Sequence, residues 1–229
     1  MSAGGIEGVF SYAGRTGTPI AQALPVRVGG FGGIPGLVRY LRAESITHVI
    51  DATHPFAAQM STHAVAACAE TGTPLLTLER QPWTQGPGDR WNRVPDIAAA
   101  VLALPGAPTR IFLAIGRQHL DEFATRPAHH YLLRLVDAPH TAPLPDCEIV
   151  LSRGPFTVQG DLDLLQAHGI QLIVSKNSGG VGAEAKLIAA RQLALPVLMI
   201  DRPAVPDRPC VQSVAEVLDW LGHPANLGV

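Results

Sequence analysis

Short apolar runs alternate with alanine-rich helical patterns along most of the chain, and this alternation limits the possible folds more than any other feature. Two helices that end at a glycine are expected over residues 57–72 and 161–169. A third is expected over residues 183–195, where Pro196 stops it, and a last one over residues 213–222, with Ser213 as its cap. The expected strands are GVFS, HVIDA, PLLTLE, RIFLAIG, YLLRLV, EIVLS, LIVS and VLMID. Alternating β-α units build mostly parallel sheets, so we predict an α/β fold.

The chain length and one loop suggest two lobes. A chain of 229 residues can form one large or two small domains. The segment LPGAPT, residues 104–109, places prolines and a glycine between a helical pattern and a new strand, which is typical of a linker. We therefore predict one lobe over residues 1–106 and a second over residues 107–229. Ligands of such folds bind at the carboxyl ends of strands, and we expect the site in the cleft between the lobes.

Composition excludes several classes of protein. The sequence is 47% hydrophobic and 16% charged, as expected for a soluble globular chain. Its formal charge of −2, with scattered lysines and arginines, argues against nucleic acid as a partner. No apolar run approaches the roughly 18 residues of a membrane helix, and the start lacks the pattern of a signal peptide, so we expect a cytoplasmic protein without a membrane partner.

A glycine-rich loop follows the strand LIVS. Gly180, Gly182 and Ala185 spell G-x-G-x-x-A at a helix start, and Asp201 ends the next strand. This is either a dinucleotide-binding fingerprint or an ordinary glycine-rich turn. Lys176, at the end of the strand, favours an anionic ligand because a cation and unpaired N–H groups at a helix start attract phosphate or carboxylate.

Two further loops follow strands in the first half of the chain. After GVFS, Ser11 and Arg15 stand where an NAD-binding chain has an acidic residue, which favours the 2′-phosphate of NADP; the alternative is a solvated turn. After HVIDA come Thr53, His54 and Pro55, which we expect to precede or open a helix whose first turn contains the proline. His54 could donate a proton or contact a ribose, although a lone histidine is more often structural.

Three cations follow strands in the second half of the chain. Arg117, Arg153 and Lys176 each stand at a strand end, and together they could cradle a ligand with several carboxylates. The histidines lack metal-ligand spacing, and the three cysteines indicate neither a zinc site nor a disulfide framework, so no metal is expected.

A set of motifs in a fixed order resembles one family. SYAGRT, GGFGG, HVIDATHPFA, RGPF, SKNSGG with EAKLIAA, and PVLMIDRP are similar to the motifs of the precorrin-6A reductases of cobalamin biosynthesis, over nearly the whole chain. The resemblance implies two Rossmann-like lobes and an NADPH-dependent oxidoreductase that acts on a CH–CH group. It would reduce the precorrin-6A macrocycle to precorrin-6B without metal or flavin.

The resemblance also implies roles for the strand-end residues. Ser11, Arg15 and Thr16 would lie near the 2′-phosphate of NADPH, and Thr53, His54 and Pro55 further along the cofactor. The substrate carries acetate and propionate groups, and its binding residues would be Arg117, Arg153, Lys176, Asn177, Ser178, Gly179 and Gly180. His54 is the one side chain nominated as a proton donor.

Family members begin with a strand and a turn of the kind LGGTTEA, whereas this sequence starts at MSAGGIEGVF. We therefore expect the pyrophosphate loop and a central strand to be absent from this sequence. Two other functions stay open: a generic NAD-dependent dehydrogenase that holds its cofactor on the 180–185 loop with Asp201, and a non-catalytic tetrapyrrole carrier. The motifs fit cobalt-free and cobalt-containing substrates equally, and a monomer is expected.

Overall fold

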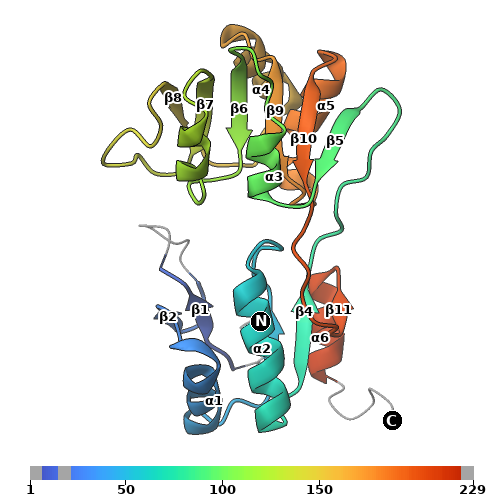
Figure 1. Cartoon of the computed structure of the whole chain (residues 1–229). Helices are drawn as coiled ribbons and strands as arrows, with labels where there is room; N and C mark the ends of the chain where they lie inside the picture. The colour runs from blue at the N-terminus through green and yellow to red at the C-terminus, as the bar shows by residue number, and fades with distance from the viewer. Residues whose placement is uncertain (1–6, 15–21, 223–229) are drawn as a thin grey trace. The chain divides into compact units, whose positions relative to one another are not determined.

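The computed structural model describes residues 7–14 and 22–222, which fall into two compact units (Figure 1). The first unit contains the described residues up to Glu79 together with those from Ala204 onward, and the second runs from Arg80 to Pro203. The chain thus passes from one unit to the other twice. The lobes expected at residues 1–106 and 107–229 are displaced from these bounds, and the expected linker at 104–109 lies inside the second unit.

The second unit is built on one parallel sheet of six strands in the order β5-β10-β9-β6-β7-β8. The strands are β5 (Arg90–Val94), β6 (Arg110–Ala114), β7 (His130–Leu135), β8 (Cys147–Leu151), β9 (Leu172–Lys176) and β10 (Pro196–Ile200). Its helices are α3 (Ile97–Leu102), α4 (Val158–Ala167) and α5 (Ala185–Gln192), with short 3-10 turns η2 (Asp121–Thr125) and η3 (Val181–Ala183). The pairing of β5 with β10 is the reason that residues 80–106 belong to this unit.

The core of the second unit lies around its central strands. Phe112 on β6, Ile173 on β9 and Met199 on β10 are fully buried and pack with Leu165 and Leu187 from α4 and α5. Strands covered on both faces read as continuous apolar runs, which is why the sequence pattern located these strands to within one or two residues.

The first unit contains two separate parallel sheets. One joins β1 (Phe10–Tyr12) to β2 (Val26–Val28), and the other has the order β11-β4-β3, with β3 (Val49–Asp51), β4 (Leu75–Leu78) and β11 (Cys210–Val211). Within residues 7–14 and 22–222 no strand pairs with both sheets.

Three helices cover these strands: α1 (Gly33–Ala43), α2 (Ala58–Thr71) and α6 (Val214–Gly222). Leu37 and Leu41 of α1 pack against Ala67 and Cys68 of α2, while Trp220 of α6 packs near Leu76 of β4. The predicted helix ends are confirmed at two places. Gly72 ends α2 with a left-handed φ of 69°, and Ser213 caps α6 by accepting a hydrogen bond of 3.2 Å from the N–H of Glu216.

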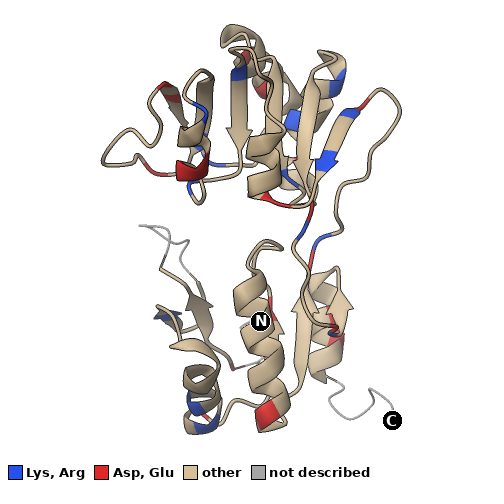
Figure 2. Ribbon diagram, in the orientation of Figure 1, with Lys and Arg blue, Asp and Glu red and all other residues tan. Residues whose placement is uncertain are grey.

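The α/β class and the mostly parallel sheets are therefore confirmed, while several elements had no clear sequence signal. These are α1, β2, β5 and β11. No helix in the described part of the chain is long and apolar enough to cross a membrane. Figure 2 shows that Lys and Arg residues are interspersed with Asp and Glu residues along the ribbon of both units.

Candidate functional site

Ser11, predicted to contact the cofactor phosphate, lies on β1 directly opposite Arg27 of β2. The Arg27 guanidinium donates to Ser11 Oγ at 3.3 Å and to the backbone oxygens of Gly29 and Gly30 at 2.6 and 2.7 Å. The other two residues predicted for this phosphate, Arg15 and Thr16, lie outside the described residues.

Arg27 is a functional candidate that the sequence analysis missed. Its guanidinium carbon lies 3.9 Å from the centre of the Phe31 ring and 5.3 Å from that of Tyr40, so the charge is held by stacking as well as by hydrogen bonds. The signal that could have found it is the pattern Val-Arg-Val in an edge strand, in which the middle side chain faces the neighbouring strand's Ser11.

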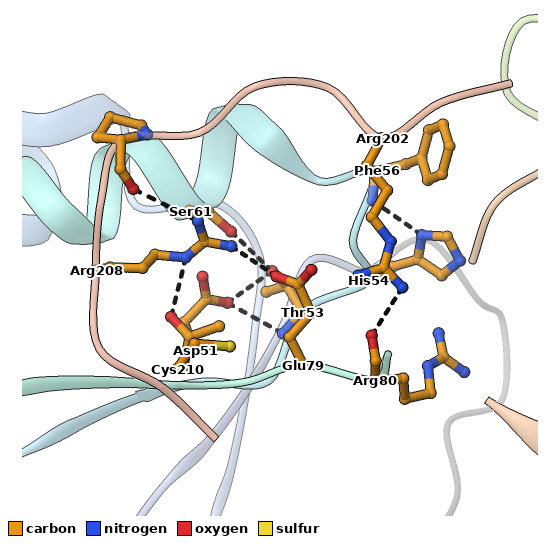
Figure 3. Close-up of polar contacts among 12 residues, drawn as sticks. Asp51, Thr53, His54, Phe56, Ser61, Glu79, Arg80, Arg202, Arg208 and Cys210 are labelled. Carbon is orange, nitrogen blue, oxygen red and sulfur yellow. Dashed lines mark hydrogen bonds and ion pairs between the residues drawn. The ribbon is translucent and has the colours of Figure 1, made fainter. Parts of the chain in front are cut away.

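The loop after β3 is organised by a buried carboxylate. Asp51 is 4% exposed, and its Oδ1 accepts hydrogen bonds from the N–H of Thr53 at 3.0 Å and from its hydroxyl at 2.6 Å (Figure 3). The Thr53 hydroxyl also lies 3.3 Å from the hydroxyl of Ser61 on α2. The Thr53 side chain therefore fixes the loop, and we infer that a ligand here would be met mainly by the loop backbone and by His54.

His54 is exposed at the tip of this loop. Its Nδ1 accepts a hydrogen bond of 3.2 Å from the N–H of Phe56, so in the neutral ring the proton sits on Nε2. The N–H of Ala57 donates to the His54 carbonyl at 2.7 Å, and α2 begins at Ala58. The expectation that Pro55 lies in the first helical turn is thus wrong, because the chain makes a separate turn before the helix.

A second polar group lies at the end of β4. Arg208 donates to Glu79 Oε2 at 2.7 Å and to Thr77 Oγ1 at 3.0 Å (Figure 3). Both members of the ion pair are more than four-fifths buried, so the segment that leads into β11 is tied to β4 by a pair that water screens only weakly.

In the second unit, the predicted cations stand at the carboxyl edge of the sheet, because every neighbouring pair of strands is parallel. Lys176 ends β9 and is 8% exposed; burial lowers the pKa of its amine, and the charge of Glu122 partly opposes that shift. Arg117 follows the adjacent β6 and Arg153 follows β8, and both are exposed. The three cations therefore follow strands that end at one edge of the sheet, and their joint role in holding a ligand stays a prediction.

The side chain of Asn177, in the SKNSGG motif, has a structural role in the second unit. It is buried and contacts the backbone of Trp83 at both polar atoms: Oδ1 accepts from the Trp83 N–H at 2.8 Å, and Nδ2 donates to the Trp83 oxygen at 3.0 Å. Asn177 therefore holds the segment by which the chain enters the second unit.

The two glycines of this motif also face that segment. A Cβ on Gly179, whose φ is 70°, would stand 1.9 Å from the carbonyl oxygen of Gln81, and one on Gly180 would stand 2.6 Å from the side chain of Arg80. Gly179 is required because another stretch of backbone crosses it closely, and Gly180 is favoured because its φ of 76° lies in the left-handed region. This backbone conformation accounts for Gly180 without a bound pyrophosphate.

Arg202, which follows β10, completes the same arrangement. Its Nε donates to the Asn177 oxygen at 2.9 Å, and its Nη2 to the oxygens of Arg80 and Ser178 at 2.7 and 3.1 Å. The neighbouring Asp201 forms an ion pair with Arg93 of β5 at 2.8 Å. The carboxylate that a generic dehydrogenase would offer to a ribose is thus engaged within the sheet.

Within residues 7–14 and 22–222, no three His, Cys, Asp or Glu side chains are grouped so that they could hold a metal ion. The strand ends carry cations, hydroxyls and backbone amides, while the carboxylates of Asp51, Glu79 and Asp201 are engaged by hydrogen bonds or ion pairs within the fold. The cations, hydroxyls and amides suit anionic organic ligands.

Comparison with known proteins places these motifs in a family. The model of the family described as "Precorrin-6x reductase CbiJ/CobK" matches residues 1–222. A precorrin-6A reductase of Rhodobacter capsulatus is 64% identical over 95% of this chain and 87% of its own length, and one of Rhodococcus erythropolis is 45% identical over 95% and 88%. A solved structure described as "CobK precorrin-6A reductase" superposes with a TM-score of 0.90 at 63% identity, covering 95% of this chain and 87% of that one. The chain belongs to the precorrin-6x reductase family.

Proposed function

We propose that this chain catalyses the NADPH-dependent reduction of precorrin-6A to precorrin-6B in cobalamin biosynthesis. The observation that carries the proposal is the family match over residues 1–222, together with relatives named precorrin-6A reductase that cover 95% of the chain. The cations at the carboxyl edge of the second unit add chemical support, because the proposed substrate carries many carboxylates.

The cobalt-free form of the substrate is favoured. The relatives named precorrin-6A reductase are 43–64% identical to this chain, whereas those named cobalt-precorrin-6A reductase, for example that of Priestia megaterium, are 29–31% identical.

The described residues of the first unit fit NADPH at its adenosine end. No acidic residue follows β1, where the sequence is Ala13 and Gly14, and the hydroxyl of Ser11 lies beside the fixed guanidinium of Arg27. A hydroxyl beside a cation can donate to a 2′-phosphate, and the strand end lacks the carboxylate with which NAD-binding sites hold the free 2′-hydroxyl. The loop of Thr53, His54 and Pro55 would contact the cofactor further along.

In the second unit, Arg117, Arg153 and Lys176 would pair with acetate and propionate groups of the macrocycle. Lys176 is largely desolvated, so a carboxylate beside it would meet little competition from water. The N–H groups of Gly179 and Gly180 would add hydrogen bonds, whereas that of Ser178 already donates to the Lys176 oxygen at 2.7 Å. Arg202 fixes this turn through the Asn177 and Ser178 oxygens.

When bound, NADPH would supply the hydride for reduction of a C=C bond of the ring to a CH–CH unit, and a proton would be needed at the other carbon. The chain orients both large anionic ligands at strand ends, and this positioning is its main contribution to the rate. His54 is the candidate proton donor, since its Nε2 carries the proton while Nδ1 is engaged by Phe56.

The test is a titration of the chain with NADPH and NADH, followed by turnover with precorrin-6A and by the spectrum of the pigment. Selective NADPH binding that is lost in Arg15→Ala, with NADPH consumed one for one with pigment, is the expected result. Ser11→Asp should move the preference toward NADH, because a carboxylate repels the 2′-phosphate and accepts from a 2′-hydroxyl.

Two outcomes would replace the proposal. Pigment binding with no spectral change on addition of NADPH would indicate a carrier. Loss of cofactor binding in Asp201→Ala, with Arg15→Ala unaffected, would indicate a dehydrogenase that uses the 180–185 loop.

A further inference from the structure

The second unit contains a buried lysine that the proposed reaction does not use. Lys186 lies on α5 and is 4% exposed. Its Nζ donates to the carbonyl oxygen of Ala183 at 2.5 Å and lies 4.4 Å from the centre of the Trp83 ring. The Trp83 Nε1 in turn donates to the oxygen of Gly180 at 3.0 Å. Trp83 and Lys186 thus contact each other and hold the two ends of the segment Gly180–Ala183.

The same segment supports the RGPF loop, which carries Arg153. The N–H of Phe156 donates to the Gly182 oxygen at 3.4 Å, and the guanidinium carbon of Arg134 on β7 lies 3.7 Å from the centre of the Phe156 ring. Arg134 also forms an ion pair with the buried Asp161 of α4. The Gly180–Ala183 segment is therefore the shared support of two loops assigned to substrate binding.

The charged groups that act on Lys186 come from three places: Arg134 on β7, Asp161 on α4 and Glu184 at the start of α5. Burial, and secondarily Arg134, lower the pKa of the amine from 10.5 to about 7, although Asp161 and Glu184 oppose that shift. The unfolded chain therefore binds the proton more tightly than the folded chain. An apolar side chain at this position would avoid the cost of desolvating the ammonium group.

We propose that Lys186 is a positioning residue for the reductase: together with Trp83 it fixes the Gly180–Ala183 segment, and through it the RGPF loop, in the conformation that receives the anionic substrate. This role rests on the proposed function. It explains why α5 keeps a buried ammonium group in a place where methionine would fill the same space, since function at such sites is commonly maintained against stability.

Lys186→Met tests the role because it keeps the length of the side chain and removes the hydrogen bond to Ala183. We expect a variant at least as resistant to urea as the wild type at pH 7, with KM for precorrin-6A raised about tenfold or more, a smaller change in kcat and an unchanged Kd for NADPH. The control is Arg191→Met, which removes the other cation of this helix together with its ion pair to the buried carboxylate of Asp89; it should leave KM unchanged even though it lowers stability.

The outcomes separate the two proposals. If Lys186→Met folds and keeps the wild-type KM, or if it loses stability with no rise in KM, the positioning role is overturned. If Lys186→Met does not fold, Trp83→Phe is the second test, because it keeps an aromatic ring beside Lys186 but loses the hydrogen bond from Nε1 to Gly180. A raised KM of Trp83→Phe for precorrin-6A supports the positioning role, and an unchanged KM overturns it. A wild-type chain that neither binds nor reduces precorrin-6A would overturn the proposed function, and the positioning role with it.

Discussion

Replacing Asn177 with alanine would remove a buried amide that holds the Trp83 backbone at both of its polar atoms. The resemblance assigns Asn177 to the substrate, but its side chain is 6% exposed and engaged within the second unit. We therefore expect Asn177→Ala to destabilise the protein in the absence of any ligand. A residue that only contacts substrate would leave the stability of the free chain unchanged.

The size of the stability loss in Asn177→Ala follows from the two Trp83 backbone groups that would lose their hydrogen-bond partner. Each buried N–H or C=O left without a hydrogen bond costs about 1–3 kcal/mol, and a small cavity adds to this. Partial relaxation and water entry reduce the sum, so we expect the free energy of unfolding to fall by about 2–4 kcal/mol. Asn177→Asp should also destabilise, because one carboxylate oxygen would face the Trp83 carbonyl where the amide now donates.

Urea denaturation followed by circular dichroism measures this change, with an unaltered m-value as the sign that the unfolded state is the same. The control is Asn92→Ala, which removes an exposed asparagine from β5 of the same unit and should stay within about 0.5 kcal/mol of the wild type. A free energy of unfolding for Asn177→Ala within that same margin would refute the reasoning.

Four further predictions concern single residues. Gly179→Ala should cost at least about 2 kcal/mol of stability, because a Cβ would collide with the Gln81 oxygen at a left-handed φ, while Gly182→Ala, which has open space, should be close to neutral in the same urea assay. The free energy of unfolding of the wild type should rise relative to that of Lys186→Met as pH increases from about 7 to 10.5, because over this range the unfolded chain binds the proton that the folded chain releases. A difference between the two free energies that does not change with pH would contradict the burial of the Lys186 amine. Asp96→Ala should lower the free energy of unfolding, measured by thermal denaturation, by about 1 kcal/mol, because the Asp96 carboxylate caps α3 by accepting a 2.7 Å hydrogen bond. His54→Ala should lower kcat with precorrin-6A, and full turnover by that variant would exclude His54 as the proton donor.

Local sequence patterns predicted the buried strands well. Runs such as those of β6, β9 and β10 are apolar at nearly every position because both faces of each strand are covered, and this requirement is visible without knowledge of the partner strands. The edge strand β5 reads Arg-Trp-Asn-Arg-Val, mixes exposed and buried positions, and was missed. Because β5 was missed, the predicted lobe boundary lies at residue 106 and not at Arg80, where the second unit begins. Nothing near β5 in the sequence shows that it pairs with β10.

The residues of the candidate site likewise include some that the sequence indicated and some that only the fold revealed. The motifs indicated the strand ends and the anionic character of the ligands, since these depend on residues close together in the chain. The amide of Asn177 and the backbone of Trp83 are 94 residues apart, and Lys186 reaches the Trp83 ring from a helix that the sequence presents as an ordinary alanine-rich one. The sequence by itself determined where the buried strands and the alanine-rich helices form and which loops carry charge, because periodicity and backbone preference act over a few residues. Only the tertiary structure decided which of those loops support one another and which lysine is buried, because burial and hydrogen-bond partners are properties of distant segments that meet in the folded chain.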